Sequence, residues 1–429
     1  MGGRKSKNCV GRRVGLVSTR FEGTDGVSLE TEKWVHVLES MNCECFYFAG
    51  SSEWDPSHTL IVPEANFKHP EIQHINEIVF SHCTRPPEIT LAIQRIKDYL
   101  KQKIYEFVHA FDLEILIVEN ALAIPLNIPL GLALTEFVAE TGLPMIAHHH
   151  DFFWERKRFL VNCVWDYFNM SFPPHLPPVH HVVINSSGAN QLSLRTGISS
   201  MLIPNIMDFD TPPAAPDEYS SDVRTALGIA PDELLFLQPT RVVPRKGIEH
   251  AIELTRRMGK KAQLVISHAS GDEGYDYEQR LKEFAALLGV TVNFESEIIR
   301  SQRDMVNGRK IYTLADIYQH CDLVTYPSDI EGFGNAFLEA IYYRRPIVVN
   351  NYSIFDIDIK PKGFQVIEFD GFITDQTIEH TRQILENKAL CEETAEHNYR
   401  LARRHYSYTM LKRRLQTLLA ECFGEEIRC

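Results

Sequence analysis

Residues 234 to 257 read LLFLQPTRVVPRKGIEHAIELTRR. The stretch opens with four consecutive apolar residues, and from Ile248 onward its apolar side chains recur with helical spacing. A short apolar run followed by an amphipathic segment is typical of a buried strand that leads into a crossover helix of a parallel sheet. The stretch therefore predicts a strand over residues 234–239, a turn, and a helix over residues 248–257.

The same alternation of strand and helix continues along the whole chain. Short runs rich in β-branched residues occur in the first half at 14–18, 45–49, 115–119, 145–149 and 182–185, and in the second half at 234–239, 262–267, 290–294, 323–326 and 347–350. Such runs between helical segments indicate an α/β fold with two parallel sheets, each covered by helices on both faces.

The length of 429 residues allows two or three domains. Residues 210–223 are rich in Pro, Ser and acidic residues, which is typical of an exposed connection. We place the domain boundary just before them, so the predicted domains are residues 1–208 and 209–404. The amphipathic pattern of residues 399–423 predicts a final helix, about 405–429, that packs back on the first domain.

Composition excludes several classes of protein. The chain has 44 basic and 57 acidic residues, a net charge of −13, which argues against a protein that coats nucleic acid or an anionic membrane. No apolar run reaches the roughly 20 residues that span a bilayer, and no secretory signal is recognisable. Nine scattered cysteines without a CxxC pair indicate reduced thiols. We expect a cytoplasmic protein without a stable membrane anchor.

Three consecutive histidines, His148 to His150, invite comparison with a metal site. Neighbouring residues of a strand point to opposite faces, so the three cannot all bind one ion, and we predict no metal site there. The chain also has no GxGxxG and no GxxxxGK[ST] motif, so a dinucleotide oxidoreductase or a P-loop enzyme has no support.

The turn after the predicted strand 234–239 carries the cations Arg241, Arg245 and Lys246 and ends in Gly247. Arginine binds phosphate in a bidentate manner, lysine supplies a point charge, and the helix that follows presents free N–H groups. This turn therefore suits a diphosphate.

The loop after the predicted strand 323–326 begins PSDIEGFGNAFLEA, residues 327–340. Gly332 and Gly334 allow the backbone to approach a ligand closely. Glu331 and Glu339 are eight residues apart, which in a helix corresponds to about 12 Å. That is too far for the roughly 5 Å carboxylate pair of a retaining hydrolase. We expect the two acids to hold different parts of one long ligand.

With these motifs the chain resembles the family-4 glycosyltransferases, which are retaining nucleotide-sugar enzymes of the GT-B fold. The resemblance is carried by the Glu-x7-Glu element EGFGNAFLE and by RVVPRKG at residues 241–247. Supporting matches are Pro204-Asn205, residues 318–328 and the loop at residues 23–28. It implies a hexosyltransferase with two Rossmann-like domains that face each other across a cleft, and with no essential cofactor or divalent metal.

The resemblance also implies roles for individual residues. Arg241 and Lys246 neutralise the donor diphosphate, and Glu331 and His150 contact the transferred sugar. The remaining donor-binding residues are Gly332, Phe333, Gly334, Asn335 and Glu339, and the phosphate or acceptor loop is Asp25, Gly26, Val27 and Ser28. Residues 343–346 and 350–356 depart from the family pattern, and we transfer no contacts to them.

The acceptor side is predicted from residues 148–159, HHHDFFWERKRF, where Asp151, Arg156 and Arg158 are the candidates. Aromatic faces suit a sugar ring, and the cations suit a phosphate or a carboxylate. This stretch is similar to enzymes that make mannosylglucosylglycerate-type compatible solutes. It favours GDP-mannose, then UDP-glucose, as donor, and a small anionic acceptor such as a glucosyl-(phospho)glycerate.

Other functions stay open on the sequence alone. They are transfer to a lipid-linked or cell-envelope glycan, a glycoside phosphorylase, and a sugar-nucleotide binding protein without catalysis. The expected partners are the small-molecule donor and acceptor and no nucleic acid, while a homo-oligomer remains an alternative to a monomer.

Overall fold

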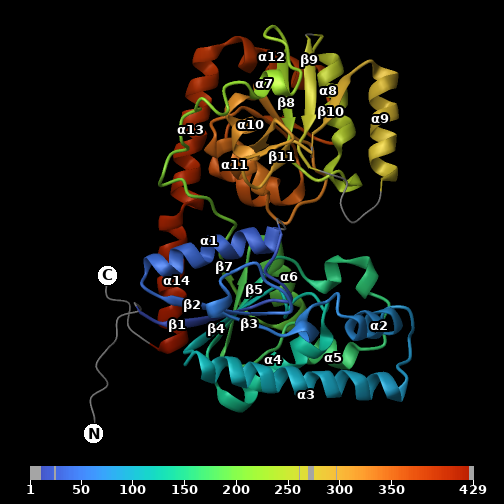
Figure 1. Cartoon of the computed structure of the whole chain (residues 1–429), viewed down its shortest axis with the longest axis vertical. Coiled ribbons are helices and arrows are strands. Elements are labelled where there is room, and N and C mark those ends of the chain that lie inside the picture. Colours follow the sequence, from blue (N-terminus) through green and yellow to red (C-terminus); the bar gives the residue numbers. More distant parts are fainter. Residues whose placement is uncertain (1–10, 24–25, 260, 269–274, 296, 425–429) are drawn as a thin grey trace. The chain divides into compact units, whose positions relative to one another are not determined.

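The computed structural model describes residues 11–23, 26–259, 261–268, 275–295 and 297–424. The chain divides into two compact units (Figure 1). Unit 1 comprises residues 1–205 together with 408–429, and unit 2 comprises residues 206–407. The division falls between Asn205 and Ile206, whereas the composition of the linker had suggested residue 208.

Unit 1 contains a seven-stranded sheet in the order β3-β2-β1-β4-β5-β6-β7, with every neighbouring pair parallel. The strands are β1 (Arg13–Val17), β2 (Glu44–Ala49), β3 (Thr59–Ile61), β4 (Ile115–Glu119), β5 (Met145–His149), β6 (Val179–Val183) and β7 (Met201–Leu202). The first strand lies in the interior of the sheet between β2 and β4, so the strand order reverses there, as in doubly wound α/β folds.

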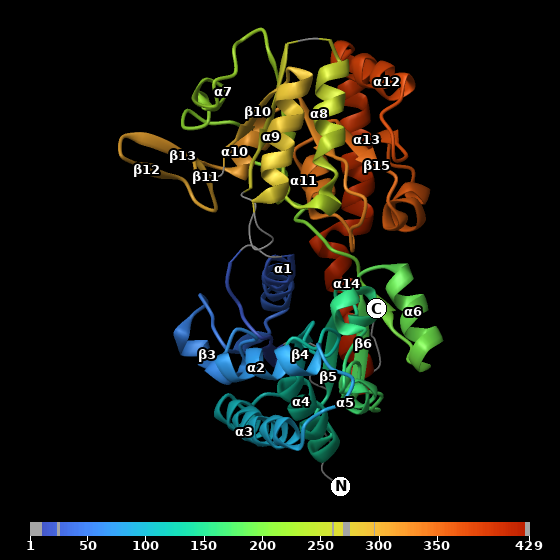
Figure 2. The same cartoon turned by 90° about the vertical axis from the view of Figure 1, so that its right-hand side faces the viewer.

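Helices cover both faces of this sheet (Figure 1). One face packs with α2 (Pro70–Val79), α3 (Pro87–Ala110), α4 (Ile128–Thr141) and α5 (Trp165–Ser171) into a core that includes Phe48, Leu116 and Phe107. Figures 1 and 2 show α1 (Gly26–Ser40) on the opposite face. Helix α14 (Tyr408–Phe423) contacts α1, and α6 (Ser186–Thr196) connects β6 to β7.

Unit 2 contains a six-stranded parallel sheet in the order β10-β9-β8-β14-β15-β16. Its strands are β8 (Leu234–Gln238), β9 (Ala262–Ile266), β10 (Thr291–Phe294), β14 (Leu323–Tyr326), β15 (Ile347–Asn350) and β16 (Ile367–Phe369). The helices are α7 (Val223–Ala226), α8 (Ile248–Arg257), α9 (Asp276–Leu288), α10 (Leu314–His320), α11 (Asn335–Tyr342), α12 (Asp375–Glu386) and α13 (Lys388–Tyr406). Helix α8 has the bounds that the sequence pattern predicts.

A small three-stranded sheet, β11 (Ile299–Arg300), β12 (Asp304–Val306) and β13 (Arg309–Thr313), extends from unit 2 (Figure 2). The segment predicted as an exposed connection, residues 210–223, is anchored to it. The hydroxyl of Tyr219 donates hydrogen bonds to the carbonyl oxygens of Asp304 and Ile311. Ser220 is fully buried. The second half of this segment is therefore part of unit 2, because its polar side chains have partners that composition cannot reveal.

The C-terminal amphipathic pattern of residues 399–423 is not one continuous helix but falls in two, and the final helix predicted from about residue 405 corresponds to α14, which packs on α1 of unit 1. Helix α13 ends at Tyr406, Ser407 is extended with φ −87° and ψ 165°, and α14 begins at Tyr408. Tyr399 and Tyr406 are buried in α13, while Leu411 and Leu415 are buried in α14. Each helix keeps its own apolar stripe, and the periodicity therefore continues across the break.

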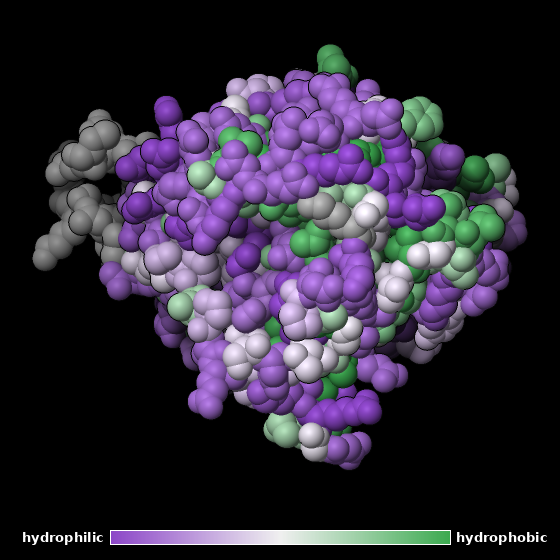
Figure 3. Space-filling view, turned by 90° about the horizontal axis from the view of Figure 1, so that it is seen from above, coloured by the Kyte–Doolittle hydropathy of each residue, from purple (hydrophilic) through white to green (hydrophobic). Residues whose placement is uncertain are grey.

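Hydrophilic residues cover most of the face of the molecule that Figure 3 shows. Among the helices that the structure describes, none combines the length and the apolar character that crossing a bilayer requires.

Candidate functional site: two polar clusters at the sheet switch points

The predicted site residues that the structure describes follow strands that lie at, or next to, the point where the strand order of each sheet reverses. In unit 1 that point is between β1 and β4, and in unit 2 it is between β8 and β14. Ligands of open parallel sheets bind outside the carboxyl ends of the strands at such points. The loops after β1, β4, β8 and β14 therefore define one candidate region in each unit.

In unit 2 the basic turn and the acidic loop are held together by their backbones. The backbone N–H of Asp329 donates to the carbonyl oxygen of Arg245 over 2.9 Å. Gly247 has φ +56°, and a Cβ added there would lie 2.5 Å from the carbonyl oxygen of Pro327. Glycine is required because the conformation is left-handed and the other loop passes directly over it.

Lys246 and Glu331 form a buried ion pair at this junction. Lys246 is 8% exposed, and the nearest Arg245 nitrogen lies 3.5 Å from the second Glu331 oxygen. Burial opposes the charge of Glu331, but Lys246 outweighs it and the pKa of the carboxyl is lowered. Burial lowers the pKa of Lys246 despite the attraction of Glu331. Removing one partner of such a pair leaves an uncompensated buried charge.

Arg241 differs from Lys246 because its side chain is exposed and has no ion-pair partner among the residues that the structure describes. His268 lies just beyond the carboxyl end of β9, and the positive charges of the basic turn affect its pKa. Burial lowers its pKa, and the positive charges of Arg241 and Lys246 lower it further. Sequence reasoning missed His268, since nothing in the sequence around it resembles a binding motif.

The acidic loop is supported from β14 and β15. Gly334 has φ +135°, which only glycine adopts readily, and Tyr352 donates a 2.6 Å hydrogen bond to the carbonyl oxygen of Phe333. The side-chain amide of Asn350 donates to Asp329 over 2.9 Å. Residues 350–356, to which no family contacts were transferred, thus support the acidic loop through Asn350 and Tyr352.

Glu331 and Glu339 have different partners, and only part of the segment between them is helical. Helix α11 begins at Asn335, so the helical spacing assumed from sequence applies from that residue onward. Glu339 accepts a 2.9 Å hydrogen bond from the buried hydroxyl of Tyr318. The two carboxylates are therefore held by separate groups: Glu331 by the basic turn, and Glu339 by α10.

In unit 1 the loop predicted to close over phosphate or acceptor leads into α1, which begins at Gly26. Ser28 is 3% exposed, and its hydroxyl donates to the carbonyl oxygen of Glu22 over 3.4 Å. Val27 lies in the same first turn. Asp25 lies outside the described residues.

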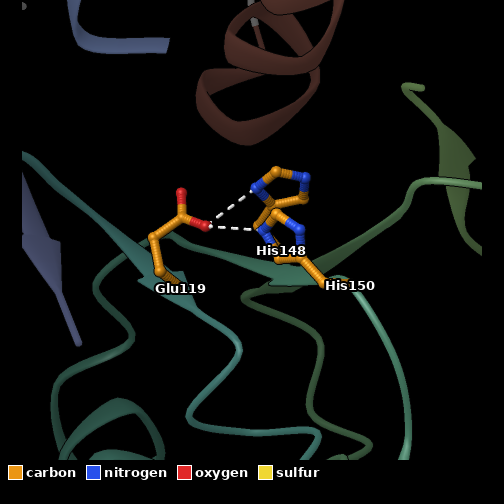
Figure 4. A group of neighbouring side chains, drawn as sticks. All are labelled: Glu119, His148 and His150. Atoms are coloured by element: carbon orange, nitrogen blue, oxygen red, sulfur yellow. Dashed lines mark hydrogen bonds and ion pairs between the residues drawn. The ribbon is translucent and has the colours of Figure 1, made fainter. Parts of the chain in front are cut away.

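Glu119, His148 and His150 form the second cluster, at the carboxyl ends of β4 and β5 (Figure 4). One carboxylate oxygen of Glu119, Oε2, lies 2.9 Å from His148 Nδ1 and 3.3 Å from His150 Nε2. Burial alone would raise the pKa of Glu119. The charges and hydrogen bonds of the two histidines have the larger effect and lower this pKa to about 2. The pKa of His150 is raised because its hydrogen bond to Glu119 and the carboxylate charge outweigh burial.

These three residues are also of the types that bind metal ions. Their candidate ligand atoms all lie within 4.8 Å of one another. The strand places His149 on the opposite face, where its Nε2 lies 2.9 Å from His181 Nδ1. Sequence reasoning treated the three histidines together and missed Glu119, which comes from the neighbouring strand.

The proposed acceptor residues surround the turn after β5. Asp151 forms an ion pair with Arg156 and accepts a 3.0 Å hydrogen bond from the side chain of Asn120. Arg158 lies over the ring of Phe159, 4.5 Å from its centroid, and burial lowers its pKa. Arg158 has no carboxylate partner within the described parts of the chain, whereas Arg156 is already paired.

A cavity of 790 Å³ in unit 1 lies apart from this cluster. Its lining includes Val179 and Met201, the first residues of β6 and β7, together with Arg414 of α14. It contains none of the predicted site residues. Because the candidate cluster lies at the opposite ends of the strands, the cavity and the cluster are separate features of unit 1.

Comparison with known proteins agrees with this architecture. The family described as Glycosyl transferases group 1 matches residues 220–401. The chain is 33% identical to the mannosylglucosylglycerate synthase of Thermotoga maritima over 93% of this chain and 98% of that protein. It is 31% identical to the mannosylglucosylglycerate synthase of Petrotoga mobilis over 82% of this chain and 86% of that protein.

Among solved structures, a glycosyltransferase from Rickettsia africae matches with a TM-score of 0.68 and 13% identity, over 97% of this chain and all of that one. The two Rossmann-like parallel sheets thus have the GT-B fold of glycosyltransferases, as predicted. The chain belongs to the group 1 glycosyltransferases.

Proposed function

We propose that the chain is a retaining mannosyltransferase that transfers mannose from GDP-mannose to glucosylglycerate. The observation that carries this proposal is the 33% identity to a mannosylglucosylglycerate synthase along 98% of that protein. The name of that relative describes the product of adding a mannosyl group to glucosylglycerate. UDP-glucose is the next donor to test, and a phosphorylated glucosylglycerate is the next acceptor.

The proposed chemistry needs fixed positive charge more than a protein nucleophile. The bond between the anomeric carbon and the diphosphate oxygen breaks, and a bond from that carbon to an acceptor hydroxyl oxygen forms on the same face of the sugar. The hydroxyl proton passes to the departing diphosphate. Arg241, Lys246 and the first N–H groups of α8 are the candidates to stabilise the charge on this leaving group. We expect no essential divalent metal.

The ion pair of Lys246 with Glu331 supports a division of roles in this reaction. Glu331 holds the ammonium in place, and its second oxygen, which lies 3.5 Å from Arg245, is proposed to accept hydrogen bonds from sugar hydroxyls as well. Such preorganised charge is effective because it needs little rearrangement when the reaction occurs. Gly332, Phe333, Gly334, Asn335 and Glu339 are proposed to complete the donor site around it.

An anionic acceptor fits the guanidinium of Arg158, which has no carboxylate partner among the described residues. The glycerate carboxylate of the proposed acceptor matches a planar guanidinium in geometry and charge. Arg156 is paired with Asp151, so its proposed part is to hold that carboxylate in the turn after β5. Gly26, Val27, Ser28 and Asp25 remain candidates for closing over phosphate or acceptor.

The proposal is tested by measuring transfer from GDP-mannose, UDP-glucose and ADP-glucose to glucosylglycerate, glucosyl-3-phosphoglycerate and glucosylglycerol. GDP-mannose with glucosylglycerate should give the highest kcat/KM, and the uncharged glucosylglycerol should be a poor acceptor. Activity should persist in EDTA. Arg158→Ala should raise KM for glucosylglycerate and leave KM for GDP-mannose unchanged.

Other outcomes would identify other functions. Equal use of charged and uncharged acceptors would remove the anionic-acceptor part of the proposal. Breakdown of a disaccharide that depends on free phosphate and needs no nucleotide would identify a glycoside phosphorylase. Transfer only to a lipid-linked sugar would identify an enzyme of glycan assembly.

A further inference from the structure

The carboxylate of Glu119 is unusually placed for a group that serves only the fold. It lies at the carboxyl end of the central strand β4, it is 1% exposed, and its Oε1 atom has no hydrogen-bond partner among the described residues. A buried carboxylate is costly unless it is paired, and apolar residues of similar size often stabilise a core equally well. A second role would explain its presence.

The contacts of Glu119 fix the side chain of His150. A carboxylate can only accept hydrogen bonds, so His150 must carry a proton on Nε2 to donate to Oε2 over 3.3 Å. His148 donates from Nδ1 to the same oxygen, and its ring stacks on Trp34 of α1 with centroids 4.2 Å apart. Nδ1 of His150 has no partner within the described residues, so it is the ring atom left for a ligand.

The next residue, Asn120, fixes the backbone of the same histidine. Its side-chain oxygen accepts a 3.1 Å hydrogen bond from the backbone N–H of His150. Its own N–H donates to the carbonyl oxygen of His148 over 2.8 Å. Asn120 has φ +58°, a left-handed conformation that asparagine tolerates better than most residues. Glu119 thus holds the side chain of His150, and its neighbour Asn120 holds the backbone of the same histidine.

We propose that Glu119 is a positioning residue that acts through His150: its carboxylate selects the ring orientation and places Nδ1 toward the substrate. This rests on the proposed function, in which His150 contacts the transferred sugar. The role resembles that of a carboxylate that orients a catalytic imidazole and fixes its tautomer. Nothing in the sequence motif that surrounds His150 identifies Glu119, which lies 31 residues away.

The same three side chains could instead hold a metal ion. The hydrogen-bond interpretation is favoured because both rings approach one oxygen, Oε2, at distances that suit N–H···O bonds. Metal binding is a separate outcome that the experiment must distinguish. It requires the ring nitrogens to lose their protons.

The first test uses nitrogen NMR of histidine-labelled protein and needs no substrate. The His150 signals are assigned by their loss in His150→Asn. The proposal predicts a proton on Nε2 of His150 in the wild type and altered His150 signals in Glu119→Gln. The matched control is Glu114→Gln, just before the other end of the same strand, where the carboxylate pairs with Arg12 over 2.8 Å. It should leave the His150 signals unchanged.

The second test is a double-mutant cycle on kcat and KM. Glu119→Gln and His150→Asn should each lower kcat at least tenfold with little change in KM for the donor, and the double variant should lose no more than His150→Asn alone. Multiplicative losses, or a cycle in which Glu119 couples to His148→Asn and not to His150→Asn, would overturn the proposal. Melting temperatures of all variants separate these effects from unfolding.

The outcomes of the two tests distinguish failure of the positioning role of Glu119 from failure of the role proposed for His150. A proton on Nδ1 and not on Nε2 in the wild type would overturn the positioning role whatever the activity. One equivalent of zinc, manganese or iron that is present in the purified wild type and absent from Glu119→Gln would overturn it in favour of a metal site. The predicted NMR result together with wild-type turnover in His150→Asn would instead refute the catalytic role proposed for His150.

Discussion

The two switch points of this molecule carry clusters of different chemical character. In unit 2, Lys246 and Glu331 form a buried ion pair, and the exposed guanidinium of Arg241 lies near enough to act on Lys246, so this cluster is built from ammonium, guanidinium and carboxylate groups. In unit 1, Glu119 is surrounded by the imidazoles of His148 and His150, whose polarity depends on which nitrogen carries a proton. Ammonium and guanidinium groups suit a diphosphate, whereas imidazoles suit a directed hydrogen bond to a sugar.

The clusters also differ in how they respond to loss of one member. The unit 2 pair is a buried salt bridge, in which removal of either partner leaves a charge without compensation. The unit 1 cluster shares one carboxylate between two rings, so either histidine can be removed while Glu119 keeps a donor. We therefore expect substitutions in unit 2 to affect both stability and activity, and substitutions of a single histidine in unit 1 to affect mainly activity.

The largest effect is expected for Lys246→Ala. It leaves Glu331 buried with only the more distant Arg245 as a cation, and it should lower the free energy of unfolding by about 3 kcal/mol and nearly abolish transfer. Denaturant unfolding and turnover measure the two effects. The double variant Lys246→Ala/Glu331→Gln should recover much of the stability and none of the activity. A stable Lys246→Ala protein would contradict the buried ion pair.

Arg241→Ala should separate activity from stability. Turnover should fall about 10²-fold because a fixed charge on the leaving group is lost, which corresponds to about 2.7 kcal/mol. The melting temperature should not change, since the side chain is exposed and unpaired in the described structure. The control is Arg256→Ala, another exposed arginine of unit 2. Turnover within a few-fold of wild type in Arg241→Ala would remove this residue from the site.

Acid sensitivity should reveal the buried histidine pair of unit 1, His149 and His181. Burial lowers the pKa of His181 to about 4, so between pH 6.5 and 4 the unfolded chain binds a proton that the folded one does not. This costs the folded state about 2 kcal/mol between pH 6.5 and pH 5. His181→Asn should flatten the stability profile in that window, whereas exposed His74→Asn should not. An unchanged profile in His181→Asn would contradict the lowered pKa.

The smallest effect is expected for Tyr352→Phe. Loss of the hydrogen bond to Phe333 should destabilise unit 2 by about 1 kcal/mol and raise KM for the donor a few-fold, because the loop is less well held. Tyr399→Phe is the matched control, since its hydroxyl donates to the carbonyl oxygen of Phe209 over 3.1 Å in the same unit. The two variants should lose similar stability, and only Tyr352→Phe should change KM.

The fold and the unit 2 cluster could be predicted from sequence because their signals are local. Apolar runs of four to six residues identify parallel strands, and the cations of residues 241–246 are contiguous with the helix start that they precede. The helix break at Ser407 was not predicted, because the apolar periodicity continues across it. Strands β3, β7 and β16 were not predicted from the sequence, because they are only two or three residues long and too short to show a periodic pattern.

The unit 1 cluster could be predicted only in part. His150 and Asp151 follow a recognisable strand, but Glu119 and Asn120 belong to another strand, and only the parallel pairing of β4 with β5 brings them together. Polar residues directly after the apolar run of residues 115–118 were the available signal. The contacts of Asn350 and Tyr352 with the acidic loop after β14 likewise depend on tertiary structure.

The most direct test of this division of roles is calorimetric titration of GDP into the wild type, Arg241→Ala and His150→Asn. We predict that Arg241→Ala raises the Kd of GDP at least tenfold, whereas His150→Asn leaves it within twofold of wild type although both variants lose turnover. Equal weakening of GDP binding in both variants, or none in Arg241→Ala, would contradict the account.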